Sequence, residues 1–134
     1  MSIMSRSQIE EVAKSSLVEL ASHTANHLLL NEISPPQIEN ELIDSQRWLI
    51  SLGFDSVPIL AYPKGRYSAE VISVLQRLGW WGAVTVKPGL INSKSPRFEL
   101  PRIPIDSATT LALFKLALSD GYAWYATIAH AKFF

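Results

Sequence analysis

Two histidines stand four positions apart in the segment Ser22-His23-Thr24-Ala25-Asn26-His27, directly after a short apolar stretch. Neutral imidazole is the commonest metal ligand among protein side chains. Metal binding requires ring nitrogens that converge on a point about 2 Å from each of them. A short turn after a strand can bring His23 and His27 together in this way, so we interpret them as candidate ligands of one divalent cation.

An arbitrary His-x-x-x-His pair is more often two ordinary polar residues of a loop. The position of His23 at the end of a strand-like run favours metal ligation instead, because barrels of alternating strands and helices carry their active sites at the carboxyl ends of strands. The neighbouring Ser22 and Thr24 favour the same interpretation. His130 has no partner nearby in the sequence, and we expect it to be a surface residue.

A second segment with chemical potential is Ala61-Tyr62-Pro63-Lys64-Gly65-Arg66-Tyr67. Pro63 fixes one backbone angle and lacks an N–H, whereas Gly65 can adopt conformations closed to other residues. A strand that ends in this way should turn sharply and leave a backbone N–H facing a cleft. Such a donor can stabilise the oxyanion of a tetrahedral intermediate. Taken alone, Pro-x-Gly indicates only a turn.

Strand and helix patterns alternate along the chain. Capping boxes at Ser7–Glu10 and Ser34–Gln37 predict two helix starts. Helices are expected from Ser7 to about Lys14, from Ser34 to Gly53, from Ser68 to Gly79 and from Ser107 to Ser119. Strands are expected at Leu17–Ser22, Val57–Tyr62 and Trp80–Val86, with a further extended segment at Leu100–Ile105. Pro101 and Pro104 keep this last segment from being an ordinary central strand.

Apolar strands that alternate with amphipathic helices predict a parallel sheet with helices packed over it. Three or four strands cannot close a barrel, and they leave open sheet edges. We therefore expect an α/β fold that forms a partial (β/α) barrel with its helices outside. Open edges also predict self-association of the chain.

The composition is that of one globular domain spanning residues 1–134, with 48% hydrophobic and 18% charged residues. Twelve basic and twelve acidic residues cancel, which argues against nucleic-acid binding. The absence of cysteine excludes disulfides and thiolate chemistry. No window has the eighteen or so apolar residues of a membrane span. As written, the chain lacks a signal peptide and is expected in the cytoplasm, or outside the cell if a longer precursor carries it.

Together the two motifs resemble the polysaccharide deacetylases, the NodB-homology family (carbohydrate esterase family 4) of metal-dependent carbohydrate N-deacetylases. The family's second motif is His-[Ser/Thr]-x-x-His, and the residues that match it are His23, Thr24 and His27. Leu28 stands where the family often has proline. One branch has Tyr-Pro-Tyr-Gly-Arg-Tyr as its third motif, and the residues that match this are Tyr62, Pro63, Gly65, Arg66 and Tyr67, with Lys64 in place of an aromatic residue.

The resemblance implies a hydrolase of non-peptide carbon–nitrogen bonds that removes N-acetyl (or O-acetyl) groups from a polysaccharide of N-acetylated sugars. It implies a divalent metal, zinc in the first place, held by His23 and His27. The Lys64 backbone N–H would hold the oxyanion, and Arg102 would orient a catalytic carboxylate. The residues expected to contact the substrate are Tyr62, Pro63, Gly65 and Arg66. Trp80 and Trp81 also suit a sugar site, but strand tryptophans are more often core residues.

The family's first motif, a Thr-Phe-Asp-Asp-type segment that supplies the catalytic base and the third metal ligand, has no counterpart here. None of the aspartates matches it: Asp44, Asp55, Asp106 and Asp120. The late histidine motif is not recognisable either. The resemblance therefore covers residues 7 to 120 and only the later half of the family's domain, so we expect a single truncated domain that lacks the N-terminal strands.

Two functions stay open at this point. The chain is either part of an enzyme whose aspartates come from another segment or subunit, or a non-catalytic remnant that keeps a metal or glycan contact. The sequence does not distinguish chitin oligomers, peptidoglycan, poly-N-acetylglucosamine and xylan as substrates.

Overall fold

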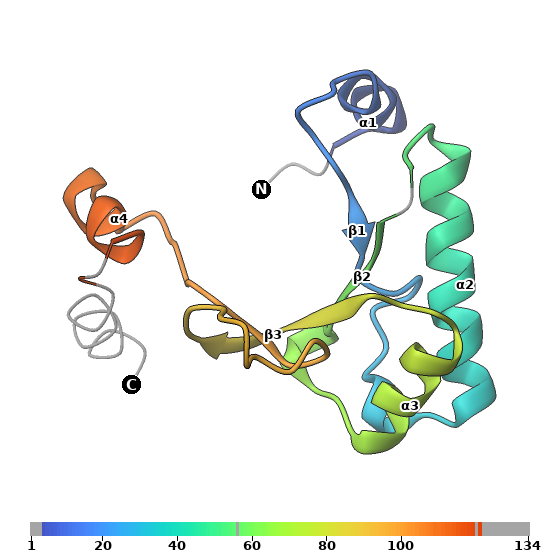
Figure 1. Cartoon of the computed structure of the whole chain (residues 1–134). Coiled ribbons are helices and arrows are strands. Elements are labelled where there is room, and N and C mark those ends of the chain that lie inside the picture. The colour runs from blue at the N-terminus through green and yellow to red at the C-terminus, as the bar shows by residue number, and fades with distance from the viewer. Residues whose placement is uncertain (1–3, 56, 120, 122–134) are drawn as a thin grey trace.

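A four-stranded parallel sheet forms the centre of the molecule (Figure 1). The computed structural model describes residues 4–55, 57–119 and 121. The strands, in the order in which they lie in the sheet, are β1 (Ala21–Ser22), β2 (Val57–Ala61), β3 (Gly82–Pro88) and β4 (Leu100–Arg102). Every neighbouring pair is parallel. The α/β class and the parallel sheet are confirmed.

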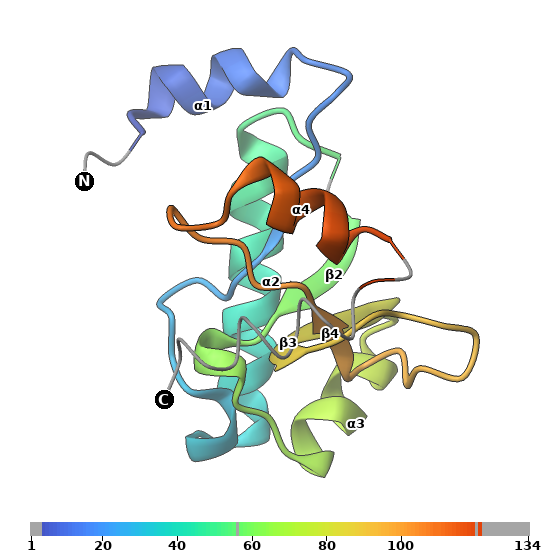
Figure 2. The same ribbon diagram turned by 90° about the vertical axis from the view of Figure 1, so that its left-hand side faces the viewer.

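Four α-helices and two 3₁₀ turns connect and cover the strands. They are α1 (Arg6–Ala13), η1 (Leu30–Glu32), α2 (Pro35–Ser51), η2 (Pro63–Gly65), α3 (Ala69–Arg77) and α4 (Leu111–Ala117). Helices α2 and α3 lie side by side on one side of the sheet, whereas α4 lies on the other side (Figures 1 and 2). No helix in the described ranges is long and apolar enough to cross a bilayer.

Helix α2 begins and ends where the sequence predicts. The Gln37 side chain accepts the Ser34 N–H at 3.0 Å, Pro35 occupies the first helical position, and Gly53 adopts a φ of +91° just after the end. Its buried face joins α3, η1, β2 and β3 in one core, whose residues are Leu30, Ile38, Leu42, Leu60, Tyr62, Val71, Val74, Leu75, Trp80 and Ala83. This core holds the carboxyl end of β2 against α2.

The predicted bounds of the first helix and first strand are wrong. Helix α1 is capped by Ser5, whose hydroxyl accepts the Gln8 N–H, so the capping box lies two residues before the predicted one. Strand β1 is only Ala21–Ser22 rather than Leu17–Ser22, and Leu17 is 92% exposed. Because β1 is an edge strand paired only with β2 within the described residues, the run before it has no second neighbour to extend it.

Two later predictions also need correction. Strand β3 begins at Gly82 instead of Trp80. Trp80 is a core residue, as expected, but Trp81 is 65% exposed, which corrects its expected place in the core. The last helix is shorter than predicted because Thr110 caps it, while the Asp106 carboxylate accepts the Ala108 N–H in a separate turn. The expected positions of Asp120 and His130 lie outside the described residues.

The sheet does not close. Strands β1 and β4 lie at opposite ends of its order and are not paired with each other. The described part of the chain is therefore a partial barrel with two free strand edges, as predicted. Strand β1 is the edge next to residues His23–His27, which we call the histidine loop.

Candidate metal and active site

His23 follows β1 directly and lies at the carboxyl end of the sheet. Its Nδ1 is 2.7 Å from the main-chain oxygen of Ala61, the last residue of β2. Since a carbonyl oxygen can only accept a hydrogen bond, Nδ1 carries the proton of the neutral ring. The lone pair of Nε2 is then free, which is the tautomer that a metal ligand needs.

His27 is brought back against His23 by the loop between them. The two ring centroids are 4.8 Å apart, and the rings meet edge to face with an interplanar angle of 74°. The loop achieves this with two non-glycine residues in the left-handed region, Thr24 at φ +68° and His27 at φ +57°. The structure thus brings together the two histidines that the sequence singled out.

No group of three or more His, Cys, Asp or Glu side chains that could hold a metal occurs among the residues the structure describes. Asp44 lines a cavity beside His23, but its side chain is 60% exposed and lies 3.6 Å from Arg47. The described residues therefore offer two imidazoles in contact with each other and no third side chain that completes a metal site.

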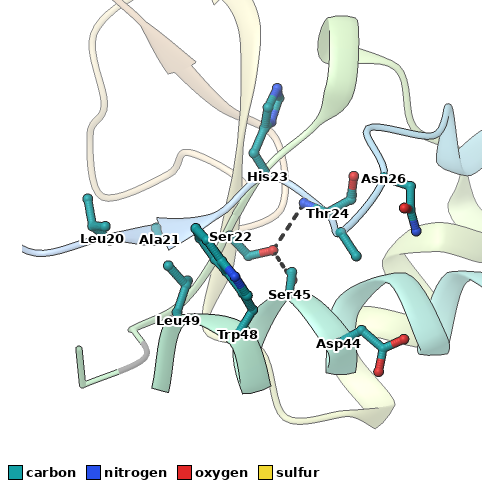
Figure 3. Close-up of a pocket in the computed structure, with 11 residues that line it drawn as sticks. Leu20, Ala21, Ser22, His23, Thr24, Asn26, Asp44, Ser45, Trp48 and Leu49 are labelled. Carbon is teal, nitrogen blue, oxygen red and sulfur yellow. Dashed lines mark hydrogen bonds between the residues drawn. The ribbon is translucent and has the colours of Figure 1, made fainter. Parts of the chain in front are cut away.

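A cavity of about 640 Å³ lies between β1 and α2. Its lining residues are Leu20, Ala21, Ser22, His23, Thr24, Ala25, Asn26, Asp44, Ser45, Trp48 and Leu49. Figure 3 shows that Ser22 points toward Ser45 of α2, whereas the His23 ring points away from that helix. The Trp48 side chain is half exposed at this free edge of the sheet.

The Tyr62–Arg66 turn has the sharp form that its sequence predicts. The N–H groups of Gly65 and Arg66 donate to the carbonyl oxygens of Tyr62 and Pro63, at 2.8 and 3.1 Å. Lys64, between Pro63 and Gly65, has a φ of +52°. Its own N–H has no acceptor among the described residues. This N–H is available as a donor at the carboxyl edge of the sheet.

Tyr62 is a core residue, which corrects the expectation that its ring contacts a sugar. It is 1% exposed, stacks on Tyr67 and donates its hydroxyl to the main-chain oxygen of Phe98 at 3.0 Å. Burial raises the pKa of Tyr62 well above its ordinary value of 10.0, and the nearby Tyr67 and Glu99 raise it further. Pro63 is also buried, whereas Lys64 and Arg66 are exposed.

A second polar cluster ties this turn to the neighbouring strands. The Tyr67 hydroxyl donates to Glu99 at 2.9 Å, and the Lys87 ammonium donates to the Tyr67 oxygen at 2.8 Å. The hydrogen bond with Tyr67 raises the pKa of Lys87, and the charge on Glu99 adds to this. Lys87 therefore remains a cation at neutral pH beside the end of β3.

Arg102 lies on β4, where its Nε–H donates to the main-chain oxygen of Thr85 at 2.6 Å. This bond fixes the guanidinium beside β3. Within the described residues no carboxylate pairs with Arg102. Its expected role toward a catalytic carboxylate thus stays a prediction.

Residues 2–82 match the sequence model of a family described as polysaccharide deacetylase. This match covers more than half of the 134 residues. The chain belongs to the polysaccharide deacetylase family. The matched residues include both the His23–His27 segment and the Tyr62–Arg66 turn.

Individual relatives support this assignment. YxkH of Bacillus subtilis (strain 168), named as a candidate polysaccharide deacetylase, is 27% identical over 111 residues. The polysaccharide deacetylase BC0361 of Bacillus cereus is 28% identical with a TM-score of 0.76 over 87% of this chain. The deacetylase PplD of Streptococcus pyogenes, solved in complex with acetate, is 26% identical with a TM-score of 0.71 over 80% of this chain.

The chain spans less than half the length of each of these relatives. The matched regions are 39% of YxkH, 37% of the BC0361 chain and 47% of the PplD chain. The relatives therefore contain elements beyond those that this chain shares with them.

Sequence reasoning missed two residues that shape the histidine loop, Glu41 and Ser45 of α2. Both are buried on the face of α2 that packs on the core. A signal was present, because they follow Ile38 by three and seven positions and so fall in its apolar stripe.

Proposed function

We propose that this chain supplies the two-histidine part of a metal-dependent site that deacetylates a polysaccharide of N-acetylated sugars. The observation that carries the proposal is the His23–His27 pair: His23 is fixed in the ligand tautomer by Ala61, and its ring meets that of His27 at the carboxyl edge of the sheet. Membership of the polysaccharide deacetylase family supports the reaction class.

The donor set fits a zinc ion in part. Zinc binds imidazole nitrogen readily, and catalytic sites usually use three protein ligands. His23 and His27 provide two, so a further ligand, expected to be a carboxylate, comes from outside the described residues. A bound divalent metal supplies Lewis-acid polarisation of the amide carbonyl and of the attacking water.

The Tyr62–Arg66 turn contributes a donor to the proposed reaction. We assign the Lys64 N–H to the oxyanion that develops on the acetyl carbonyl, since its direction is fixed by the packed turn around it. Gly65 and the Tyr67 network keep that turn against β3. We assign the exposed Arg66 side chain to contact with the polymer, and Arg102 to orientation of the catalytic carboxylate.

The second candidate function is a non-catalytic fold that retains a metal or glycan contact. The specific observation in its favour is that the described residues contain two candidate metal ligands and no third. The two functions differ in one outcome. When a longer version of the chain supplies the missing carboxylates, the enzyme should release acetate and the non-catalytic fold should not.

The experiment is a measurement of zinc content together with acetate release from N-acetylglucosamine oligomers. It compares the chain alone with a longer version that includes the residues encoded directly before Met1. His23→Ala and His27→Ala test the pair, and His130→Ala is the matched control for loss of a histidine. A base typically contributes about 10²–10⁴-fold in rate, so the chain alone should be slower than an active longer version by this order.

Acetate release that requires both His23 and His27, but not His130, supports the enzyme. Zinc binding with no acetate release in any version supports the non-catalytic fold. Equal zinc content in the wild type and in a variant that combines His23→Ala with His27→Ala removes the ligand assignment and, with it, the proposed metal-dependent deacetylation.

A further inference from the structure

Two polar side chains interrupt the buried stripe of α2. The residues of this helix that are buried are Ile38, Glu41, Leu42, Ser45 and Leu49. Glu41 and Ser45 are each only 6% exposed. Burying a carboxylate costs free energy unless hydrogen bonds compensate it, so a glutamate at a core-facing position indicates a specific contact.

The contact of Glu41 is with Asn26, which lies between the two histidines. One carboxylate oxygen accepts the Asn26 backbone N–H at 2.8 Å, and the other accepts the Asn26 side-chain amide at 2.6 Å. No cation pairs with Glu41 within the described part of the chain. Hydrogen bonds to an ionised carboxylate are stronger than neutral ones, and this pair fixes both the backbone and the side chain of Asn26.

A chain of hydroxyl groups anchors the other end of the same loop. Ser45 donates its hydroxyl to the Leu42 carbonyl at 2.9 Å, so it must accept from Ser22 across their 2.6 Å contact. The Ser22 oxygen is then free to accept the Thr24 N–H at 3.2 Å (Figure 3). Glu41 and Ser45, one helical turn apart, thus grip the loop at Asn26 and at Thr24.

The loop needs such anchors because its backbone is strained. Thr24 and His27 both adopt left-handed conformations, at φ +68° and +57°. Non-glycine residues stay in this region only where the surrounding structure fixes them. The two strained residues flank Asn26, the residue that Glu41 holds.

We propose that Glu41 is a positioning residue of the histidine loop. Its carboxylate clamps Asn26, keeps the strained backbone in place and so holds the His23 and His27 rings against each other before a metal binds. Glu41 touches neither ring, so it acts through the loop. This inference rests on the proposed function for its consequence, metal affinity, but its structural claim can be measured without a metal.

The test compares Glu41→Gln with Glu39→Gln in the full 134-residue chain. Glutamine keeps the size of Glu41 but replaces one acceptor oxygen with a donor that faces the Asn26 donors. Glu39 lies on the same helix and bonds Arg77 instead, at 2.5 Å, so it is a matched control. Three readouts are needed: zinc affinity by titration calorimetry, hydrogen exchange of the Asn26 amide, and the nuclear Overhauser effect between the His23 and His27 rings.

Glu41→Gln should weaken zinc binding by about tenfold or more, as loss of a supporting group around metal ligands typically does. It should also speed exchange of the Asn26 amide and reduce the contact between the rings. Glu39→Gln should leave all three unchanged. Asn26→Ala is the second variant, to be used if Glu41→Gln fails to fold. It lies at an exposed position and removes only the hydrogen bond between the Asn26 side chain and Glu41, so it should weaken zinc binding less than Glu41→Gln.

Asn26 protection and ring contact that persist in Glu41→Gln overturn the positioning role, whatever the zinc affinity. Zinc binding that is unchanged in His23→Ala, together with a ring contact that depends on Glu41, upholds the positioning role and overturns the proposed metal function. The two proposals therefore fail separately.

Discussion

At the scale of single residues, the Tyr62–Arg66 turn depends on Gly65. This glycine has φ +67°, and a Cβ built on it would overlap the Val86 side chain and come within 3.0 Å of the Val86 nitrogen. No other residue fits both the conformation and the space. The position of the Lys64 N–H, which precedes it, therefore depends on the absence of a side chain at residue 65.

Gly65→Ala should lower the free energy of unfolding more than Gly53→Ala does. Gly53 also has a positive φ, +91°, but a Cβ there meets nothing within 4 Å. Gly53→Ala, the control, should therefore lower the free energy of unfolding only through its left-handed backbone conformation, by about 1–2 kcal/mol. Gly65→Ala should lower it by about 1–3 kcal/mol more, because the added methyl group overpacks against Val86. Urea unfolding measures both values. Equal losses would show that contact with Val86 does not matter.

The sequence identified the two histidines because their spacing and position are local features. It did not identify the partner of His23, since Ala61 is 38 residues away and contributes only a backbone oxygen. It placed Tyr62 on the sugar site because an aromatic side chain at a strand end suits either a core or a sugar. It passed over Glu41 because the stripe was defined by apolar residues alone.

At the scale of elements, Tyr62 joins the end of β2 to the segment that leads into β4. Its hydroxyl donates to Phe98, and its ring packs in the core. Because burial raises the pKa of Tyr62, the folded protein favours the protonated hydroxyl. The stability that this gives is complete below the ordinary value of 10.0 and is lost as pH rises toward the higher pKa of the folded state.

The free energy of unfolding of the wild type should therefore fall as pH rises above about 10. In Tyr62→Phe this fall should be smaller, while at neutral pH the variant should be less stable by about 1 kcal/mol through loss of one hydrogen bond. Denaturant unfolding at several pH values compares the two proteins. Parallel pH profiles would mean that Tyr62 ionises as freely in the folded protein as in the unfolded one.

Helix starts were predictable where a cap and the following stripe agreed, as at Ser34 and Ser68. Strand lengths were not. The run from Leu17 to Ser22 has the composition of a strand, but its length depends on a neighbouring strand, which the described residues provide on one side only. Composition alone carries no information about such pairing.

At the scale of the whole molecule, the described residues leave apolar surface at the free edge of β1. Trp48 is 52% exposed beside the cavity there, and Leu17 is 92% exposed. Parallel sheets are normally covered on both faces and do not present open edges to water. The alternation of strands and helices was enough to predict this partial barrel, because it requires only local patterns.

The isolated chain should self-associate through this edge. Light scattering should show an apparent mass that rises with protein concentration. Trp48→Lys should reduce this rise, because it places a charge at the cavity between β1 and α2. Trp81→Lys is the matched control, since Trp81 is 65% exposed but does not line the cavity. A monodisperse monomer at all concentrations would contradict the expectation.

The most direct measurement of the central claim is a crystal structure of the chain soaked with zinc, with anomalous scattering to locate the metal. If both imidazoles bind one ion, as we propose, one zinc peak should lie at about 2.0–2.1 Å from the Nε2 of His23 and from a ring nitrogen of His27. The Nδ1 of His23 should still bond Ala61. Rings that point apart, or zinc bound elsewhere with none at this pair, would contradict the account.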